Sequence, residues 1–171
     1  CAAAVIYEPP KEFNPASNVV RLAFDADAVL FNEDSELRYK KEGIDSFSKY
    51  EKENKDIPLQ EGPFAKLLKK LSKIQESLPV TVELSPLRLA IVSSRSAPAH
   101  MRVINTLKKW GVYVNEVYFL GGMPKDKVLK AFGAHIFFDD QDIHLESSSK
   151  VVPSGKVPYS SDSPLKKIKG E

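Results

Sequence analysis

Two carboxylates, Asp25 and Asp27, stand one residue apart where an apolar run ends. The run Val19–Phe24, broken only by Arg21, predicts a buried strand that gives way to a loop at this pair. Ligands of open α/β sheets bind at the carboxyl ends of strands. Two acids with no basic residue beside them repel each other unless a cation lies between them. The pattern is typical of a divalent-metal site with a nucleophilic carboxylate; the alternative is a solvated turn that happens to hold two aspartates.

Polar side chains also follow the other strands that we expect, over Leu87–Val92, Val114–Leu120 and His135–Phe138. In chain order, the residues that follow these strands are Ser93-Ser94-Arg95, then Gly121-Gly122 with Pro124-Lys125, and finally Asp139-Asp140. Because the carboxyl ends of parallel strands share one edge of a sheet, all of them would lie near the first pair. Together they offer the carboxylates, hydroxyl and cationic groups that phosphate chemistry requires.

Each of these residues also has a purely structural interpretation. Ser93 would cap a helix, and Asp139-Asp140 would cap the next one. Arg95 is either a solvated loop charge or a substrate contact. Lys125 is either a surface residue or, since a lysine in a first helical turn opposes the helix dipole, a partner of a bound anion.

The elements that must position these side chains alternate between strand and helix. Helices are predicted over Ser96–Trp110 and Pro124–Phe132, and a last strand over Lys150–Val152. This alternation predicts an α/β fold, a Rossmann-like parallel sheet with helices on both faces.

A long helical, polar-rich stretch separates the first two of those strands. Its predicted helices run from Asp34 or Ser35 to about Glu42, ended by Gly43, from about Ser46 to Asn54, and from Phe64 to Leu78. This is more than a simple crossover needs, so we expect a small helical cap inserted after the first strand. The expected organisation is a core of residues 1–31 and 85–152, a cap of residues 32–84 and a loosely held tail of residues 153–171.

Length and composition limit the classes of function. The 171 residues suffice for one domain with a substantial core, and the net charge of +2 gives no overall field that favours nucleic acid. No apolar run predicts a membrane span or a signal peptide. The single cysteine, Cys1, excludes an internal disulfide and suits a reducing compartment, so we expect a cytoplasmic protein. The three histidines lack metal-ligand spacing, and neither a Walker loop nor a Cys/His cluster occurs.

The ordered set Asp-x-Asp, Ser, Lys and Asp-Asp, between about Val20 and Asp142, resembles the haloacid dehalogenase (HAD) superfamily of phosphohydrolases. Four stretches look more specifically like the cytosolic 5'-nucleotidase I family: 23–31, 50–63, 120–125 and 135–141. Ser93-Ser94-Arg95-Ser96 stands where that family is expected to have Thr-Ala-Arg-Ser, and serine keeps the hydroxyl donor. Family members are longer, so the resemblance covers their carboxyl-terminal catalytic part. It leaves open a contact with an upstream region and a homo-oligomer.

The resemblance implies a Mg²⁺-dependent hydrolase of nucleoside 5'-monophosphates, with AMP favoured, that acts through an aspartyl-phosphate. Asp25 would attack phosphorus, while Asp27 would protonate the departing nucleoside and then activate water. Mg²⁺ would be held by Asp25, by the backbone carbonyl of Asp27, and by Asp139 or Asp140.

Substrate contacts follow from the same resemblance. Ser93 would donate to a phosphate oxygen, and Lys125 would neutralise another and orient Asp25. The cap would close over the site, with two aromatic residues either stacking on the base or packing in its own core. The candidate substrate-binding residues are Ser93, Ser94, Arg95, Phe47 and Tyr50.

Three rival functions share part of this pattern. A receiver-type signalling domain has its acidic pair first and its phosphoacceptor mid-chain, whereas here the acidic doublet comes last and a long insertion follows the first strand. A HAD phosphatase for another small phosphate ester would carry the same general motifs. A catalytically silent HAD-like module would serve an assembly, although the intact acidic, hydroxyl and lysine residues disfavour it.

Overall fold

The structure is a computed structural model and describes residues 2–11, 13 and 18–167. Its strands are β1 (Val5–Ile6), β2 (Val20–Phe24), β3 (Leu87–Ser93), β4 (Glu116–Phe119), β5 (Ile136–Asp139) and β6 (Ser154–Lys156). Its α-helices are α1 (Asp34–Glu53), α2 (Ala65–Ser77), α3 (His100–Trp110), α4 (Asp126–Phe132) and α5 (Asp142–Ser148). Shorter helical turns are η1 (Ala26–Leu30), η2 (Val82–Leu84) and η3 (Pro164–Lys167).

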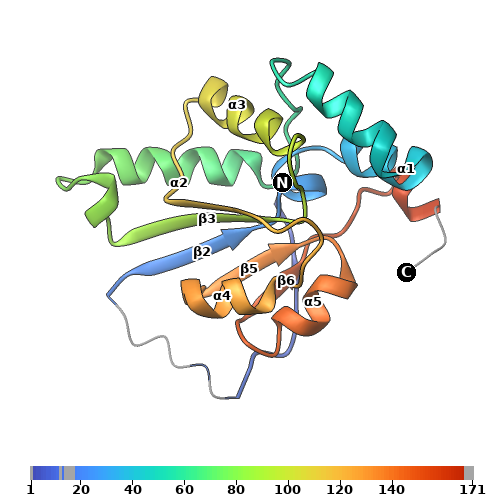
Figure 1. Cartoon of the computed structure of the whole chain (residues 1–171). Coiled ribbons are helices and arrows are strands. Elements are labelled where there is room, and N and C mark those ends of the chain that lie inside the picture. Colours follow the sequence, from blue (N-terminus) through green and yellow to red (C-terminus); the bar gives the residue numbers. More distant parts are fainter. Residues whose placement is uncertain (1, 12, 14–17, 168–171) are drawn as a thin grey trace.

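The strands form one sheet in the order β1-β6-β5-β2-β3-β4 (Figure 1). The pairs β6–β5, β5–β2, β2–β3 and β3–β4 are parallel, whereas β1 is antiparallel to β6. The predicted α/β fold is therefore confirmed, with an antiparallel edge strand added to it.

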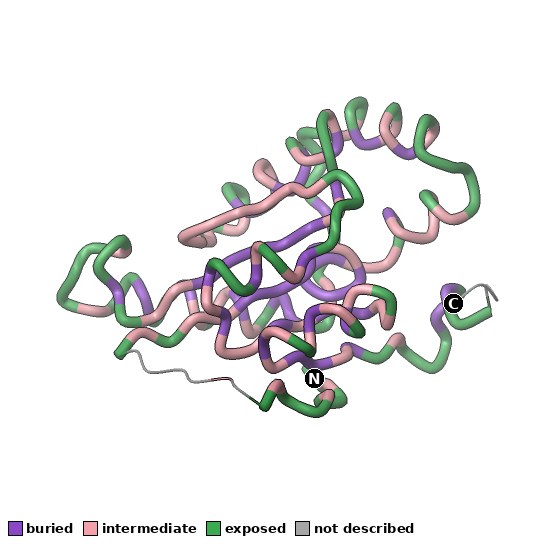
Figure 2. The backbone as a smooth tube through the Cα atoms, turned by 60° about the horizontal axis from the view of Figure 1, so that its bottom comes forward, coloured by how far each residue is buried: buried purple, intermediate pink, exposed green. Residues whose placement is uncertain are grey.

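Helices cover both faces of the sheet. Successive strand residues point to opposite sides, so the apolar strands present a face to bury on each side. One core cluster joins the sheet to α2 and α3, through Phe24, Leu89, Ile91, Leu68 and Val103. A second joins it to α4 and α5, through Ala23, Ala90, Val92, Leu129 and Leu145. Figure 2 shows the central strands buried between these layers.

The stretch that we expected to be one cap divides in two. Phe64 and Leu68 are buried in the same cluster as Phe24 and Leu89, so α2 packs on the sheet as a core helix. A period of apolar residues shows that a helix buries one face, but it does not show what that face contacts. Of the helices in this stretch, α1 is the one that lies beyond the carboxyl end of β2 (Figure 1). It is broken at Gly43, as predicted.

The segment after Pro153 is part of the fold, so the prediction of a loosely held tail is wrong for residues 153–167. Residues 150–152 form a turn, not the predicted strand, and β6 begins at Ser154 and pairs with β1 and β5. Beyond it, Val157 and Leu165 are buried. The sequence Ser-Gly-Lys lacks the apolar signal of a strand; its small residues allow close packing, since a Cβ on Gly155 would lie 3.1 Å from Ile6 and 3.2 Å from Phe138.

Candidate active site

The sheet brings the ends of β2 and β5 together. The two strands are parallel neighbours with Phe24 opposite Phe138, so Asp25 follows one strand as Asp139 ends the other. The Asp25 N–H donates to the Phe138 carbonyl at 2.8 Å. The first acidic motif and the last acidic doublet, far apart in sequence, thus meet at one edge, as expected from parallel strands.

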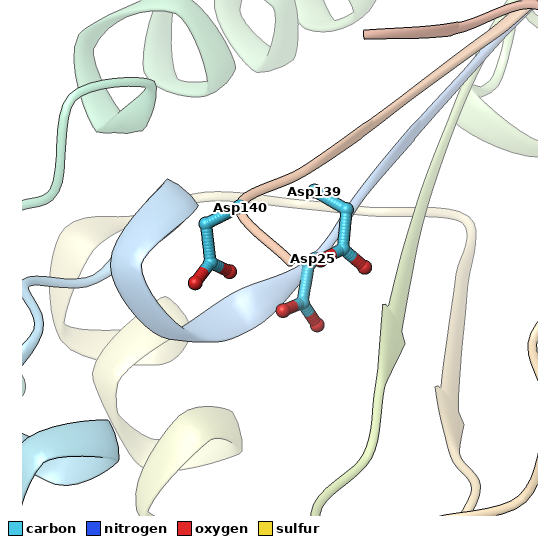
Figure 3. A group of neighbouring side chains, drawn as sticks. All are labelled: Asp25, Asp139 and Asp140. Carbon is cyan, nitrogen blue, oxygen red and sulfur yellow. The ribbon is translucent and has the colours of Figure 1, made fainter. Parts of the chain in front are cut away.

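Three buried carboxylates form the centre of the site (Figure 3). Asp25, Asp139 and Asp140 each offer an oxygen, and these oxygens lie within 4.8 Å of one another. Asp139 Oδ1 accepts from the Gln141 N–H at 2.9 Å, and Asp140 Oδ2 accepts from the Tyr159 hydroxyl. Asp140 Oδ1 is buried and has no hydrogen-bond partner among the described residues.

Lys125 lies between two of these carboxylates. Its Nζ is 2.8 Å from Asp25 Oδ1 and 2.7 Å from Asp139 Oδ2, and the residue is only 1% exposed. Burial alone would lower the pKa of Lys125, but the charges of Asp139 and Asp25 outweigh it and raise that pKa, so the ammonium keeps its charge. The interpretation of Lys125 as a surface residue is therefore wrong.

When all three are ionised, the carboxylates carry more negative charge than Lys125 balances. Burial raises the pKa of Asp25 to about 7, against the opposing charge of Lys125 and with the added repulsion of Asp139. Burial also raises the pKa of Asp140 well above its usual value, and Asp139 and Asp25 contribute. A divalent cation among these oxygens would relieve the repulsion and give Asp140 Oδ1 a partner. The residues therefore fit a hard metal ion with oxygen ligands.

We expect added Mg²⁺ to raise the melting temperature of the chain, because an ion that binds only the folded state stabilises that state. Asp140→Asn should remove most of that rise, as measured by thermal melts with and without Mg²⁺. Asp142→Asn is the matched control, since Asp142 lies outside the carboxylate cluster and pairs with Lys156. An unchanged Mg²⁺ effect in the Asp140 variant would contradict its assignment as a ligand.

Ser93, which ends β3, and the two residues after it lie at the same edge but have different partners. Ser93 is buried, and its Oγ accepts from the Arg95 N–H at 3.2 Å, so its hydroxyl caps the turn before α3. Ser94 Oγ lies 3.3 Å from His144 Nε2. Arg95 is buried and forms ion pairs with Asp27 and Glu51, so its interpretation as a solvated loop charge is wrong.

A cavity of about 400 Å³ opens beside these residues. Its lining includes Asp27, Ser94 and Arg95 together with Tyr39, Ile44 and Phe47 of α1. The rings of Tyr39 and Phe47 pack edge to face with their centroids 5.9 Å apart. The break at Gly43 lies between these two rings in sequence, so both halves of α1 contribute to the cavity.

The two aromatic candidates for base stacking differ in position. Phe47 lines the cavity, whereas Tyr50 does not and packs instead below the Arg38 guanidinium, 4.0 Å from its ring centroid. Sequence reasoning missed Tyr39 and His144, which also line the cavity. No local signal marked Tyr39, because Gly43 interrupts the helical period between Tyr39 and Phe47.

A family model described as 5'-nucleotidase matches residues 1–164. The chain belongs to the 5'-nucleotidase family. The human protein named cytosolic 5'-nucleotidase 1B is 36% identical over 153 residues, a match that covers 88% of this chain and 25% of that protein. The chain thus spans about a quarter of the length of this curated relative.

Among solved structures, a HAD-superfamily hydrolase, subfamily IA, variant 1, from Geobacter sulfurreducens PCA superposes with a TM-score of 0.50. The match has 14% sequence identity and covers 81% of this chain and 87% of that one. This likeness supports the HAD-like fold expected for a 5'-nucleotidase family member. Within the described part of the chain, no helix has the length and apolar character needed to cross a bilayer.

Proposed function

We propose that this chain is the catalytic part of a Mg²⁺-dependent phosphomonoesterase that hydrolyses nucleoside 5'-monophosphates, with AMP favoured, through an aspartyl-phosphate. The observation that carries the proposal is the buried cluster of Asp25, Asp139, Asp140 and Lys125 at the edge of the sheet. Membership of the 5'-nucleotidase family supports the nucleotide substrate. The name of the human relative supports a cytosolic location.

The proposed reaction begins at Asp25. Its free carboxylate oxygen attacks phosphorus, the bond from phosphorus to the nucleoside oxygen breaks, and Asp27 donates a proton to the departing oxygen. Lys125 keeps Asp25 in place through the 2.8 Å ion pair and stabilises negative charge on the transferring group. Ser93 hydrogen-bonds a phosphate oxygen.

The second half of the reaction restores the enzyme. Asp27 removes a proton from a water molecule, the water oxygen attacks phosphorus, and the acyl–phosphate bond to Asp25 breaks to release phosphate. Asp25, Asp139, Asp140 and the Asp27 carbonyl would hold Mg²⁺, which when bound lets the anionic carboxylate approach the anionic phosphate and neutralises developing charge.

The cavity beside the cluster has the size and lining for the nucleoside. Its volume of about 400 Å³ falls within the usual range for small-molecule sites. Phe47 offers an aromatic ring for the base, and Ser94 and Arg95 also line the cavity. A homo-oligomer and a contact with an upstream region stay predictions.

A substrate panel tests this function. The chain is incubated with the common nucleoside 5'-monophosphates and with several sugar phosphates, and released phosphate is measured in Mg²⁺, in EDTA and after Mg²⁺ is restored. We expect release from the nucleotides, with AMP fastest, that stops in EDTA and returns with Mg²⁺. Faster hydrolysis of a sugar phosphate would overturn the nucleotide assignment, and no release from any ester would overturn the phosphatase itself.

A further inference from the structure

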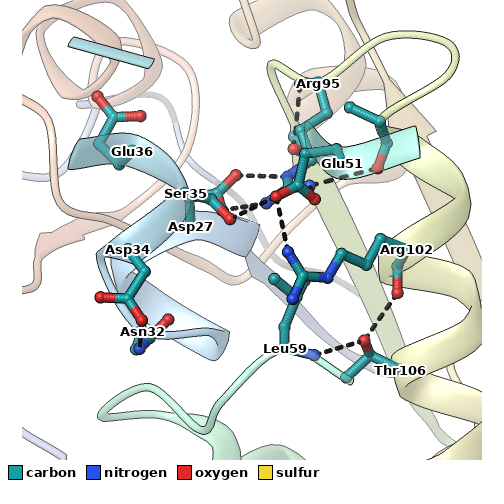
Figure 4. A network of polar contacts seen from close by, with 12 residues as sticks. Asp27, Asn32, Asp34, Ser35, Glu36, Glu51, Leu59, Arg95, Arg102 and Thr106 are labelled. Atoms are coloured by element: carbon teal, nitrogen blue, oxygen red, sulfur yellow. Dashed lines mark hydrogen bonds and ion pairs between the residues drawn. The ribbon is translucent and has the colours of Figure 1, made fainter. Parts of the chain in front are cut away.

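A chain of buried ion pairs leads away from Asp27 (Figure 4). Arg95 donates to both Asp27 carboxylate oxygens, from Nε at 2.7 Å and from Nη2 at 2.6 Å. Its Nη1 lies 2.5 Å from Glu51 Oε2, and Glu51 Oε1 accepts from Arg102 Nη1 at 2.9 Å. Two carboxylates and two guanidinium groups therefore alternate and balance one another.

The network is fixed at its far end as well. Glu51 Oε1 also accepts from the Ser35 hydroxyl at 3.0 Å, and Arg102 Nε donates to the Ile57 carbonyl at 2.9 Å. The Glu51 side chain is completely buried, and that of Arg95 is 2% exposed. Long charged side chains rarely hold one position at a surface, but these are confined by burial and by contacts on every charged end.

Every nitrogen of the Arg95 guanidinium is engaged with protein. Nε and Nη2 contact Asp27, and Nη1 contacts both Glu51 and the Ala99 carbonyl. A planar guanidinium fork matches the two oxygens of a carboxylate, which fixes the plane and direction of that group. In this arrangement Arg95 binds the Asp27 carboxylate and not a phosphate oxygen.

Stability alone is a poor reason for such a network. Buried ion pairs are often no more stabilising than apolar side chains of similar volume, because the charges must give up their hydration. Asp27, however, lines the cavity where the proposed proton transfers take place. A group that transfers protons needs an accurate position relative to the reacting oxygen.

We infer that Arg95, anchored by Glu51 and Arg102, is a positioning residue that orients the Asp27 carboxyl group for its proton transfers. The guanidinium fork occupies one lone pair of each Asp27 oxygen, and a second lone pair carries the proton. The inference rests on the proposed function. Because Glu51 lies in the second half of α1 and Arg102 in α3, the seating of α1 on α3 sets the orientation of Asp27.

The test compares two esters that differ in their need for a proton. The nucleoside oxygen of AMP leaves poorly without protonation, whereas p-nitrophenolate leaves readily without it. Arg95→Lys keeps the charge but loses the fork, and Glu51→Gln removes the anchor. The measurement is the single-turnover rate at which each ester releases its leaving group. In both variants this rate should fall on the order of 100-fold with AMP, but by about tenfold at most with p-nitrophenyl phosphate.

The matched control is Arg88→Lys, since Arg88 pairs with Glu116 at 2.8 Å at the opposite end of β3; it should leave both rates near those of the wild type. Equal slowing of the two esters in a variant that melts normally would overturn the inference alone. A wild-type chain that releases neither leaving group would overturn the proposed function, and the inference with it. If both variants misfold, a crystal structure of the Mg²⁺-bound wild type with vanadate decides: Arg95 on Asp27 supports the inference, and Arg95 on vanadate overturns it.

Discussion

Asp25→Asn is expected to abolish phosphate release from nucleoside 5'-monophosphates while the chain stays folded. An amide is a far weaker nucleophile than a carboxylate, so the acyl–phosphate bond of the first half-reaction does not form. The measurement is phosphate release at saturating AMP and Mg²⁺, together with mass spectrometry of acid-quenched enzyme for the phosphorylated form. Turnover close to that of the wild type would reject Asp25 as the nucleophile.

The same substitution should not destabilise the chain when metal is absent. Asp25 lies against Asp139 and Asp140 in a buried site, and burial together with repulsion by Asp139 raises the pKa of Asp25 to about 7. An uncharged amide removes one of the repelling charges, so we expect a melting temperature in EDTA at or above that of the wild type. Asp56→Asn, at an exposed aspartate, is the control and should change neither activity nor stability.

Lys125→Met is expected to reduce activity on the order of 100-fold or more, because one preorganised positive charge is lost beside the transferring phosphate. It should also destabilise the metal-free chain by about 3–5 kcal/mol, since Asp25 and Asp139 lose their shared buried cation. Added Mg²⁺ should recover part of that loss. Activity assays and urea denaturation with and without Mg²⁺ measure the two effects.

Lys130→Met is the matched control, because Lys130 lies in α4, the helix that Lys125 immediately precedes, but is exposed. It should leave the rate and the free energy of unfolding close to those of the wild type. A Lys125 variant that behaves like the Lys130 variant would remove Lys125 from the site.

The sequence was most informative where one rule linked it directly to space. Because parallel strands end at a common edge, the meeting of Asp25 with Asp139 and Lys125 could be anticipated from three separate motifs. The break of α1 at Gly43 could be anticipated too. The φ angle at this position is 80°, a value that glycine alone adopts at little cost.

Other features depend on tertiary contacts that leave no local signal. Glu51 lies in a run of charged residues that reads as a solvated helix face, yet it is buried between two arginines. Arg95 could be placed near the site, but its partner could not be named. The role of α2 as a core helix and the strand β6 likewise follow from what packs against them.

The position of β6 inside the sheet has a practical consequence for trimming the chain. A version cut after Val152 would lack β6, the strand that joins β1 to β5. It would leave β5 as an edge strand with unpaired backbone groups. It would also lose Tyr159, whose hydroxyl holds Asp140, and Ser163, whose hydroxyl contacts Glu33 just before α1. A minimal fragment intended to keep a working centre must therefore extend through η3.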